Sequence, residues 1–222
     1  ERAYRVLGGN DQFTNAMAKS VGLKNISLNK RVNRIATKGE AVTISYLDTQ
    51  TNRNGVISGR HVVSTIPLFR LFEVQFEPAL SELKQKAIAA QSWGSYFKAH
   101  VFVPRSSEKF WIKGENSILP ILSDSELGVI YDGNPDQKGT RIVSLLVTGD
   151  YAERYNLMPL DHVRKELLQA FDKLWPGFSK DVKEIEFYRY HPRAIASWPV
   201  GRSRFDDLSQ AIRKPENRVY LA

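Results

Sequence analysis

Apolar and polar positions alternate with two different periods along this 222-residue chain, one typical of α-helices and the other of β-strands. Apolar residues at helical spacing, from Val163 to Leu174, predict the longest helix over residues 160–174, which Trp175-Pro176-Gly177 ends. Asn10, an acidic first turn and Gly22 predict a helix over residues 11–21. A third helix is expected over residues 81–91, with Leu83, Ala87 and Ala90 toward the core.

Alternation with a period of two predicts β-strands in most of the remaining chain. Val42, Ile44 and Tyr46 alternate with polar residues, and a polar turn that includes Asn54 and Gly55 leads to Val56-Ile57, which predicts a β-hairpin. Further strands are expected over residues 61–67, 96–103, 118–122, 128–131, 142–147 and 185–190, and residues 191–203 are expected to be irregular.

Runs of strands that a few helices interrupt indicate an α+β fold with a mixed, largely antiparallel sheet flanked by helices. The hairpin region, residues 25–66, is expected to form a smaller lobe apart from the sheet of residues 94–190. Hydrophobic residues make up 42% and charged residues 25%, which is typical of a globular protein. No apolar run approaches the roughly 18 residues of a membrane span. The absence of cysteine excludes disulfides and thiolate chemistry and leaves the compartment open, with the cytoplasm favoured.

The formal net charge of +8 changes this picture little. Lysines and arginines are spread along the chain, never more than two in a row, and no nucleic-acid-binding motif accompanies them. The excess therefore favours a solvated surface, or a surface that faces an absent partner, over a nucleic-acid ligand.

Residue types that carry chemistry are few. The four histidines have no metal-ligand spacing, so no metal is expected, and no nucleophile elbow, P-loop or GxGxxG motif is present. Gly8-Gly9 precedes the first helix and either forms a tight turn or presents amides to an anion. Lys98 lies in an apolar strand and shares a face with Tyr96 and His100. It is either exposed on a sheet surface or held in a cleft, where desolvation would lower its pKa.

Taken in order, these segments resemble the central, substrate-binding part of flavin-containing amine oxidases, a family that includes monoamine, polyamine and L-amino-acid oxidases. The resemblance covers most of residues 1–111 and continues more loosely to the end. The segments that carry it are residues 1–9, Ser20-Val21-Gly22, residues 26–35, 62–67, 76–80 and 93–98, and Phe110-Trp111.

The resemblance implies roles for particular residues. Val32 corresponds to a valine whose backbone contacts the adenine end of FAD, and Gly8 and Gly9 correspond to the family's glycine pair before a helix. Lys98 corresponds to a lysine that approaches the flavin N5 through a water molecule and assists oxidation or reoxidation. Trp198 corresponds to an aromatic wall that flanks the substrate beside the flavin, and Tyr188, also assigned to substrate binding, stands about ten residues earlier, where the family often has a tryptophan.

The resemblance also implies a domain division and a reaction. Residues 1–66 would be a partial FAD-domain segment that carries the hairpin lobe, residues 67–205 the substrate-binding domain, and residues 206–222 the return strand toward the FAD domain. The parent reaction would oxidise a small-molecule amine or amino acid to an imine, with FAD as hydride acceptor. The GxGxxG motif and the Gly-Glu motif that follows the last strand are missing, so this chain alone is expected to be inactive and to need those FAD-binding segments as partners.

Alternatives stay open on the sequence. The chain could be a binding module without redox activity, or part of a flavoenzyme of the protoporphyrinogen oxidase or carotenoid desaturase type. A homo-oligomer is also compatible with the sequence.

Overall fold

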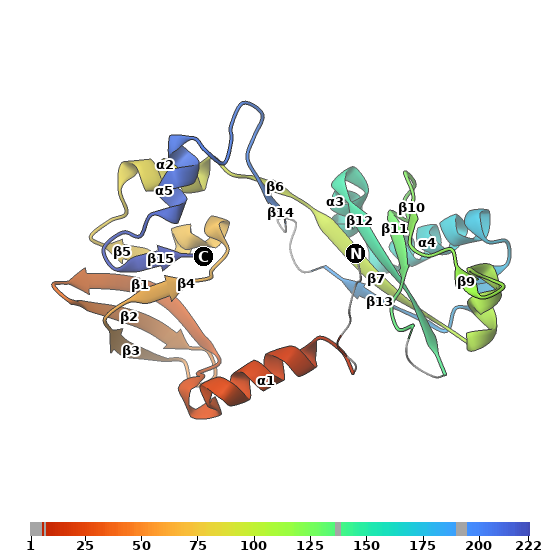
Figure 1. Ribbon diagram of the computed structural model, residues 1–222, viewed down its shortest axis with the longest axis horizontal. Coiled ribbons are helices and arrows are strands. Elements are labelled where there is room, and N and C mark those ends of the chain that lie inside the picture. The colour runs from red at the N-terminus through yellow and green to blue at the C-terminus, as the bar shows by residue number, and fades with distance from the viewer. Residues whose placement is uncertain (1–5, 7, 136–138, 190–194) are drawn as a thin grey trace. The chain divides into compact units, whose positions relative to one another are not determined.

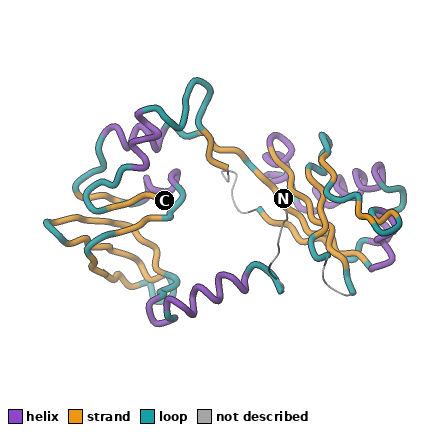
Figure 2. Tube along the Cα trace, viewed as in Figure 1, coloured by secondary structure: helices purple, strands orange, loops and turns teal. Residues whose placement is uncertain are grey.

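The computed structural model describes residue 6 and residues 8–135, 139–189 and 195–222 (Figures 1 and 2). Contacts within the chain divide it into two compact units. Unit 1 comprises residues 1–91 and 198–222, and unit 2 comprises residues 92–197. Each unit is described by itself below.

The main sheet of unit 1 has the strand order β3-β2-β1-β5. β1 (Lys30–Lys38) pairs antiparallel with β2 (Ala41–Asp48), β2 pairs antiparallel with β3 (Arg53–Gly59), and β5 (Gln75–Glu77) joins β1 in parallel. Its core side contributes to a cluster of buried residues, namely Ile35, Val42, Val74 and Val219. The predicted hairpin is therefore present as the β2–β3 pair.

The turn of this hairpin differs from the expectation. Residues 49–52 form the turn, where the Asp48 carboxylate accepts hydrogen bonds from the amides of Gln50 and Thr51 at 2.9 and 3.2 Å. Gly55 lies inside β3 instead, opposite Tyr46, whose ring occupies the space that a Cβ atom at residue 55 would need. Here the glycine marks a close side-chain approach and not a turn.

The other elements of unit 1 are helices and a short parallel strand pair. β4 (Val62–Ser64) pairs with β15 (Val219–Leu221), and two 3₁₀ turns span Leu23–Asn25 and Leu68–Glu73. α2 (Glu82–Ala89) packs on α5 (Asp207–Arg213). The buried Lys84 joins the two helices, because its Nζ donates to the carbonyls of Ile212 and Lys214 at the end of α5.

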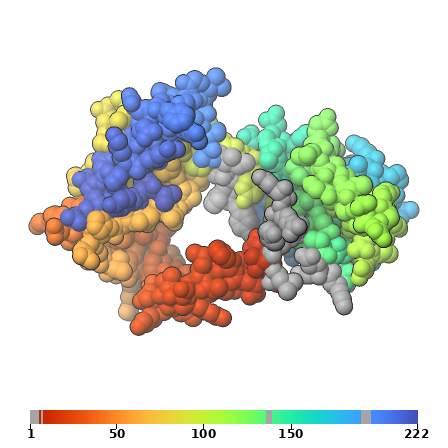
Figure 3. All heavy atoms as spheres, viewed as in Figure 1, coloured from red at the N-terminus to blue at the C-terminus, as the bar shows by residue number. Residues whose placement is uncertain are grey.

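α1 (Asp11–Val21) confirms the first predicted helix and its end at Gly22, although the Asn10 side chain makes no capping bond. Its atoms lie at the surface in Figure 3, and its apolar residues Phe13, Met17 and Val21 are exposed.

Unit 2 is built on an antiparallel sheet with the order β10-β11-β12-β7-β13. The central strands are β12 (Arg141–Thr148) and β7 (Tyr96–Val103), flanked by β11 (Val129–Asp132) and β13 (Glu184–Tyr188), with β10 (Ile121–Leu122) at one edge. Short pairs lie outside this sheet, namely β6 (Ser92–Gly94) with β14 (Ile195–Ser197) and β8 (Ile112–Lys113) with β9 (Asn116–Ser117).

Helices α3 (Gly149–Leu157) and α4 (Leu160–Leu174), with the 3₁₀ turns Arg105–Phe110 and Phe178–Asp181, pack on one face of this sheet (Figure 1). The strand residues on that face are almost fully buried, since β7 alternates strictly between buried and half-buried positions. Phe97, Val101 and Leu145 are among the buried strand residues, and Trp111 and Phe171 pack against them.

The α+β class with a mostly antiparallel sheet is confirmed, and so is the helix over residues 160–174. Besides the hairpin turn, three local predictions were incomplete or wrong. α3 and α5 were not predicted, β14 lies in the stretch expected to be irregular, and Leu83 is exposed because α2 turns Lys84, Ala87 and Ile88 inward instead. No helix within the described residues is long and apolar enough to cross a membrane.

Gly128→Ala is expected to destabilise unit 2. Gly128 has φ +60°, and a Cβ atom there would lie 2.4 Å from the Leu146 carbonyl oxygen of the central strand β12. Gly114 has a similar φ of +63° with nothing within 4 Å, so Gly114→Ala is a matched control for backbone strain alone. Urea unfolding should show Gly128→Ala about 1–3 kcal/mol less stable than Gly114→Ala. Equal stabilities would mean that β12 accommodates the methyl group.

Candidate active site

The sheet of unit 2 has a second face, opposite α3 and α4, which we call the open face. Cross-strand partners place Lys98 between Leu146 and Tyr188, and His100 between Ser144 and Glu186, so these residues form two neighbouring rows. Most of the face is half-buried, which leaves its side chains within reach of a ligand. The residues of the open face are Tyr96, Lys98, His100, Phe102, Val129, Tyr131, Ile142, Ser144, Leu146, Thr148, Glu184, Glu186 and Tyr188.

Lys98 is half-buried on this face, which is intermediate between the two predicted alternatives of an exposed side chain and one held in a cleft. Its Nζ lies 6.0 Å from the centroid of the Tyr131 ring, at the outer limit of a cation–π contact. Tyr188 is its direct cross-strand partner on β13. The structure therefore brings together two of the predicted site residues, Lys98 and Tyr188.

His100 is joined to the fully buried Ser144 by a hydrogen bond of 2.7 Å between Nδ1 and Oγ. This bond fixes the ring orientation and commits one of the two ring nitrogens. Gly133 packs against Ser144, since a Cβ atom there would lie 2.5 Å from the Ser144 hydroxyl. The imidazole thus has a defined place one row away from Lys98.

Charged neighbours act on His100 in opposite directions. Burial is the main cause that lowers the pKa of His100 below 6.5, the Lys98 charge lowers the pKa further, and the Glu186 carboxylate raises it. The Tyr188 hydroxyl donates to Oε2 of Glu186 at 2.5 Å, and the Tyr188 ring lies 5.0 Å from the His100 ring, edge to face. At neutral pH the imidazole is therefore mostly uncharged.

We expect the two neighbours to shift the titration of His100 in opposite directions. Lys98→Met should raise the pKa of His100, because a nearby positive charge disfavours the imidazolium, and Glu186→Gln should lower it. The measurement is an NMR titration of the histidine ring signals, with His100→Gln to assign the resonance among four histidines. Shifts of the same sign in both variants would contradict the proximity of these groups.

Val32 lies on β1 of unit 1, half-buried against the cluster of Ile35 and Val42. The register of β1 and β2 shifts between Val32 and Arg34, which leaves Asn33 as a bulged residue. β5 pairs only with residues 34–36, so its ladder does not cover the β1 edge at Val32. Bulges and free edges of this kind are common beside ligand sites.

Gly8 and Gly9 have φ angles of +87° and +105° and form a turn before α1, in which the Gly9 amide donates to the Val6 carbonyl at 3.1 Å. A side chain at Gly9 would meet the Asp11 carboxylate at 2.7 Å. The structure thus has the tight turn that was one of the two interpretations of this pair. The contact with a ligand stays a prediction.

Trp198 belongs to unit 1 and is half-buried against the cluster of Ala87, Leu208 and Ala211. It therefore helps to hold α2 and α5 together, and its predicted role as a substrate wall stays a prediction. The aromatic pair Phe110-Trp111 has a core role, since Trp111 is fully buried.

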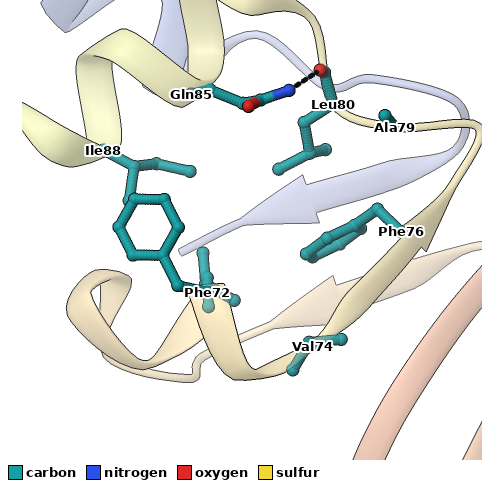
Figure 4. A pocket seen from close by; sticks show the side chains of 8 residues that line it. Phe72, Val74, Phe76, Ala79, Leu80, Gln85 and Ile88 are labelled. Carbon is teal, nitrogen blue, oxygen red and sulfur yellow. Dashed lines mark hydrogen bonds between the residues drawn. The ribbon is translucent and has the colours of Figure 1, made fainter.

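Unit 1 also contains an apolar cavity of about 180 Å³ (Figure 4). Phe72, Phe76 and Ile88 line it, and the Gln85 amide at its rim donates to the Leu80 carbonyl at 2.6 Å. No predicted site residue lines this cavity, and its lining is suited to a small apolar group and not to a charged one.

Sequence reasoning missed Ser144, Glu186 and Tyr131 as parts of the candidate site. Each lies on a different strand from Lys98, and only the register of the sheet brings them to the same face. The period of two along β7 predicted that His100 lies on the same face as Lys98, and this was the one sequence signal for a wider site.

The whole chain, residues 1–222, matches the family model described as flavin containing amine oxidoreductase. A probable flavin-containing monoamine oxidase A of Dictyostelium discoideum is 25% identical over 175 residues, which are 77% of this chain and 36% of that protein. An L-amino-acid oxidase of Echis ocellatus is 21% identical over 237 residues, which cover 100% of this chain and 45% of that protein.

Solved structures show the same fold at lower identity. Cyclohexylamine oxidase from Brevibacterium oxydans matches with a TM-score of 0.80 and 20% identity over 97% of this chain and 47% of the other. Wild-type putrescine oxidase bound to putrescine matches with a TM-score of 0.77 and 14% identity, again over 97% and 47%. The chain thus spans between 36% and 47% of the length of these proteins.

Proposed function

Because the chain belongs to the flavin containing amine oxidoreductase family, we propose that its full protein oxidises a small amine to the corresponding imine. The observation that supports this proposal is Lys98, half-buried on the open face with Tyr188 as its cross-strand partner. We propose that it has the role of the family's lysine beside the flavin. The substrate would lose a hydride from the carbon that bears its nitrogen. Since this chain spans less than half the length of its relatives, the activity is proposed for the full protein.

FAD is the cofactor of this family in the full protein, and it supplies the hydride acceptor. Two features of unit 1 support a contact at the adenine end, namely the register shift after Val32 and the end of the β5 ladder at Arg34, which leaves Val32 outside that pairing. We assign Val32 to this contact, and we propose a separate cofactor contact for the turn at Gly8 and Gly9 before α1.

The residues of the open face would bind and orient the amine. Lys98 places a positive charge and a hydrogen-bond donor at the reacting end, and its aliphatic chain and the Tyr188 ring form an apolar wall beside the substrate. Trp198 is proposed as a second wall of the substrate site. Such walls exclude water and strengthen electrostatic interactions within the site.

We also propose a division of labour along the chain. Residues 1–66 and 206–222 would contribute cofactor-facing segments, and residues 67–205 would contribute the substrate-binding region.

Product analysis tests the proposed function directly. The full-length protein is incubated in air with a series of alkylamines, and the FAD content, aldehyde and ammonia are measured, because an imine hydrolyses to these two products. We expect FAD in the protein and amine-dependent formation of both products. FAD without any product from amines would favour a different substrate class, and no FAD would contradict the assignment of a cofactor role to Val32.

A further inference from the structure

The edge strand β13 makes one side of the open face acidic, although the whole chain carries a net charge of +8. Glu184 and Glu186 both lie on this face, as cross-strand partners of Phe102 and His100, and both are exposed. Among the residues of the open face, Lys98 carries the positive charge, and it pairs with Tyr188, in the row next to that of His100 and Glu186. A positively charged group that approaches the edge of the sheet therefore meets carboxylates first.

A hydrogen bond orients the exposed Glu186 carboxylate. The Tyr188 hydroxyl donates to its Oε2 at 2.5 Å, and the Tyr188 ring packs edge to face on His100. His100 is in turn fixed by its bond to the buried Ser144. A carboxylate ordered in this way loses less conformational freedom when it binds a ligand, which favours affinity.

His100 adds hydrogen-bonding capacity beside Glu186 without adding a positive charge. Its Nδ1 is committed to Ser144, and within the described part of the chain its Nε2 makes no hydrogen bond. Burial and the charge of Lys98 lower its pKa, so at neutral pH the imidazole is mostly uncharged and does not repel a cation.

The two rows are separated by one step of the strand pattern. Lys98 and His100 are two residues apart on β7, which corresponds to about 6–7 Å along the strand. This distance is comparable to the span between the two nitrogens of a short diamine such as putrescine.

We propose that Glu186, assisted by His100, binds a second ammonium group at the end of the substrate remote from the carbon that is oxidised. This inference rests on the proposed function, since Lys98 marks the reacting end. It assigns the full protein to diamines and longer polyamines, in preference to monoamines of the same length and to amino acids, whose carboxylate Glu186 would repel.

Three probes that share a short carbon chain separate these classes. Putrescine carries a second ammonium group, butylamine an apolar end, and γ-aminobutyrate a carboxylate. In the full-length flavoprotein we expect kcat/KM to decrease in that order. Glu186→Gln should lower the ratio of kcat/KM for putrescine to that for butylamine by about ten- to a hundredfold, as expected for the loss of a charge-assisted hydrogen bond. Glu153→Gln, an exposed residue of α3 on the other face of the sheet, is the matched control and should keep the wild-type ratio.

A binding experiment supports the inference independently of turnover. Putrescine should shift the ring signals of His100 in the NMR spectrum of the wild-type protein, and it should shift them much less in Glu186→Gln. Equal kcat/KM for putrescine and butylamine, or an unchanged ratio in Glu186→Gln, would overturn the inference and leave the proposed function intact. If no amine is oxidised, the proposed function fails, and a putrescine shift that depends on Glu186 would still show a diamine site.

Discussion

Arg141→Met is expected to destabilise unit 2 by about 3–5 kcal/mol, the largest stability effect that we predict. The Arg141 side chain is almost completely buried, with Nη2 2.7 Å from the Asp132 carboxylate and Nε 3.0 Å from Glu108. Its Nη1 also donates to the carbonyls of Asn134 and Pro135. Methionine fills a similar volume but removes the cation beside the Asp132 carboxylate, whereas Glu108 also pairs with Arg105 at 3.3 Å. Removing one partner of a buried ion pair is costly.

Urea unfolding followed by tryptophan fluorescence measures this effect, because Trp111 and Trp175 are buried in the core of unit 2. The double variant Arg141→Met/Asp132→Asn is the matched control, since it removes the better buried of the two carboxylate charges and should regain part of the lost stability. A single variant as stable as the wild type would show that the ion pairs contribute nothing to this unit.

Lys98→Met is expected to lower amine turnover of the full-length flavoprotein by about a hundredfold, as is typical for the loss of a group that assists proton transfer or charge stabilisation. Methionine keeps most of the apolar chain on the open face, and Lys98 is half-buried and makes no ion pair within the described residues. We therefore expect folding to stay intact. Stopped-flow absorbance gives the rates of flavin reduction and reoxidation separately.

Lys109→Met is the control for Lys98→Met, because the Lys109 Nζ also lies over an aromatic ring, 5.0 Å from Phe110, but away from the open face. It should keep wild-type rates. If the rates of both flavin steps are unchanged in Lys98→Met, the role assigned to Lys98 is wrong, whatever the outcome for the other residues of the face.

The elements that the sequence predicts well are those with a strong local pattern. α4 repeats apolar residues at helical spacing over 15 residues, and β7 alternates over its whole length, so each signal is complete within its own segment. α3 buries only Ala152 and Tyr155, and α5 has seven residues, so neither presents an apolar stripe long enough to recognise. The Asp206 side chain, which accepts from the Ser209 amide at 2.9 Å, was the available signal for α5.

The candidate site could be predicted only along one strand. The direction of Lys98 and His100 follows from the period of β7, but Ser144 and Glu186 join them through pairings across 44 and 86 positions of sequence, and no local pattern specifies such a register. The predicted position of the hairpin turn was wrong for a related reason. Glycine is needed at residue 55 because the Tyr46 ring of the neighbouring strand fills the space of a side chain there, and not because the chain turns.

The most direct test of the proposed amine oxidation is an anaerobic addition of putrescine and butylamine to the full-length flavoprotein, followed by visible absorption of the flavin. Without oxygen the reduced cofactor accumulates, so we predict that the oxidised flavin band bleaches with each productive amine and returns when air is admitted. An oxidised band that persists in the presence of saturating amines of every class would contradict the assignment of this chain to an amine-oxidising flavoprotein.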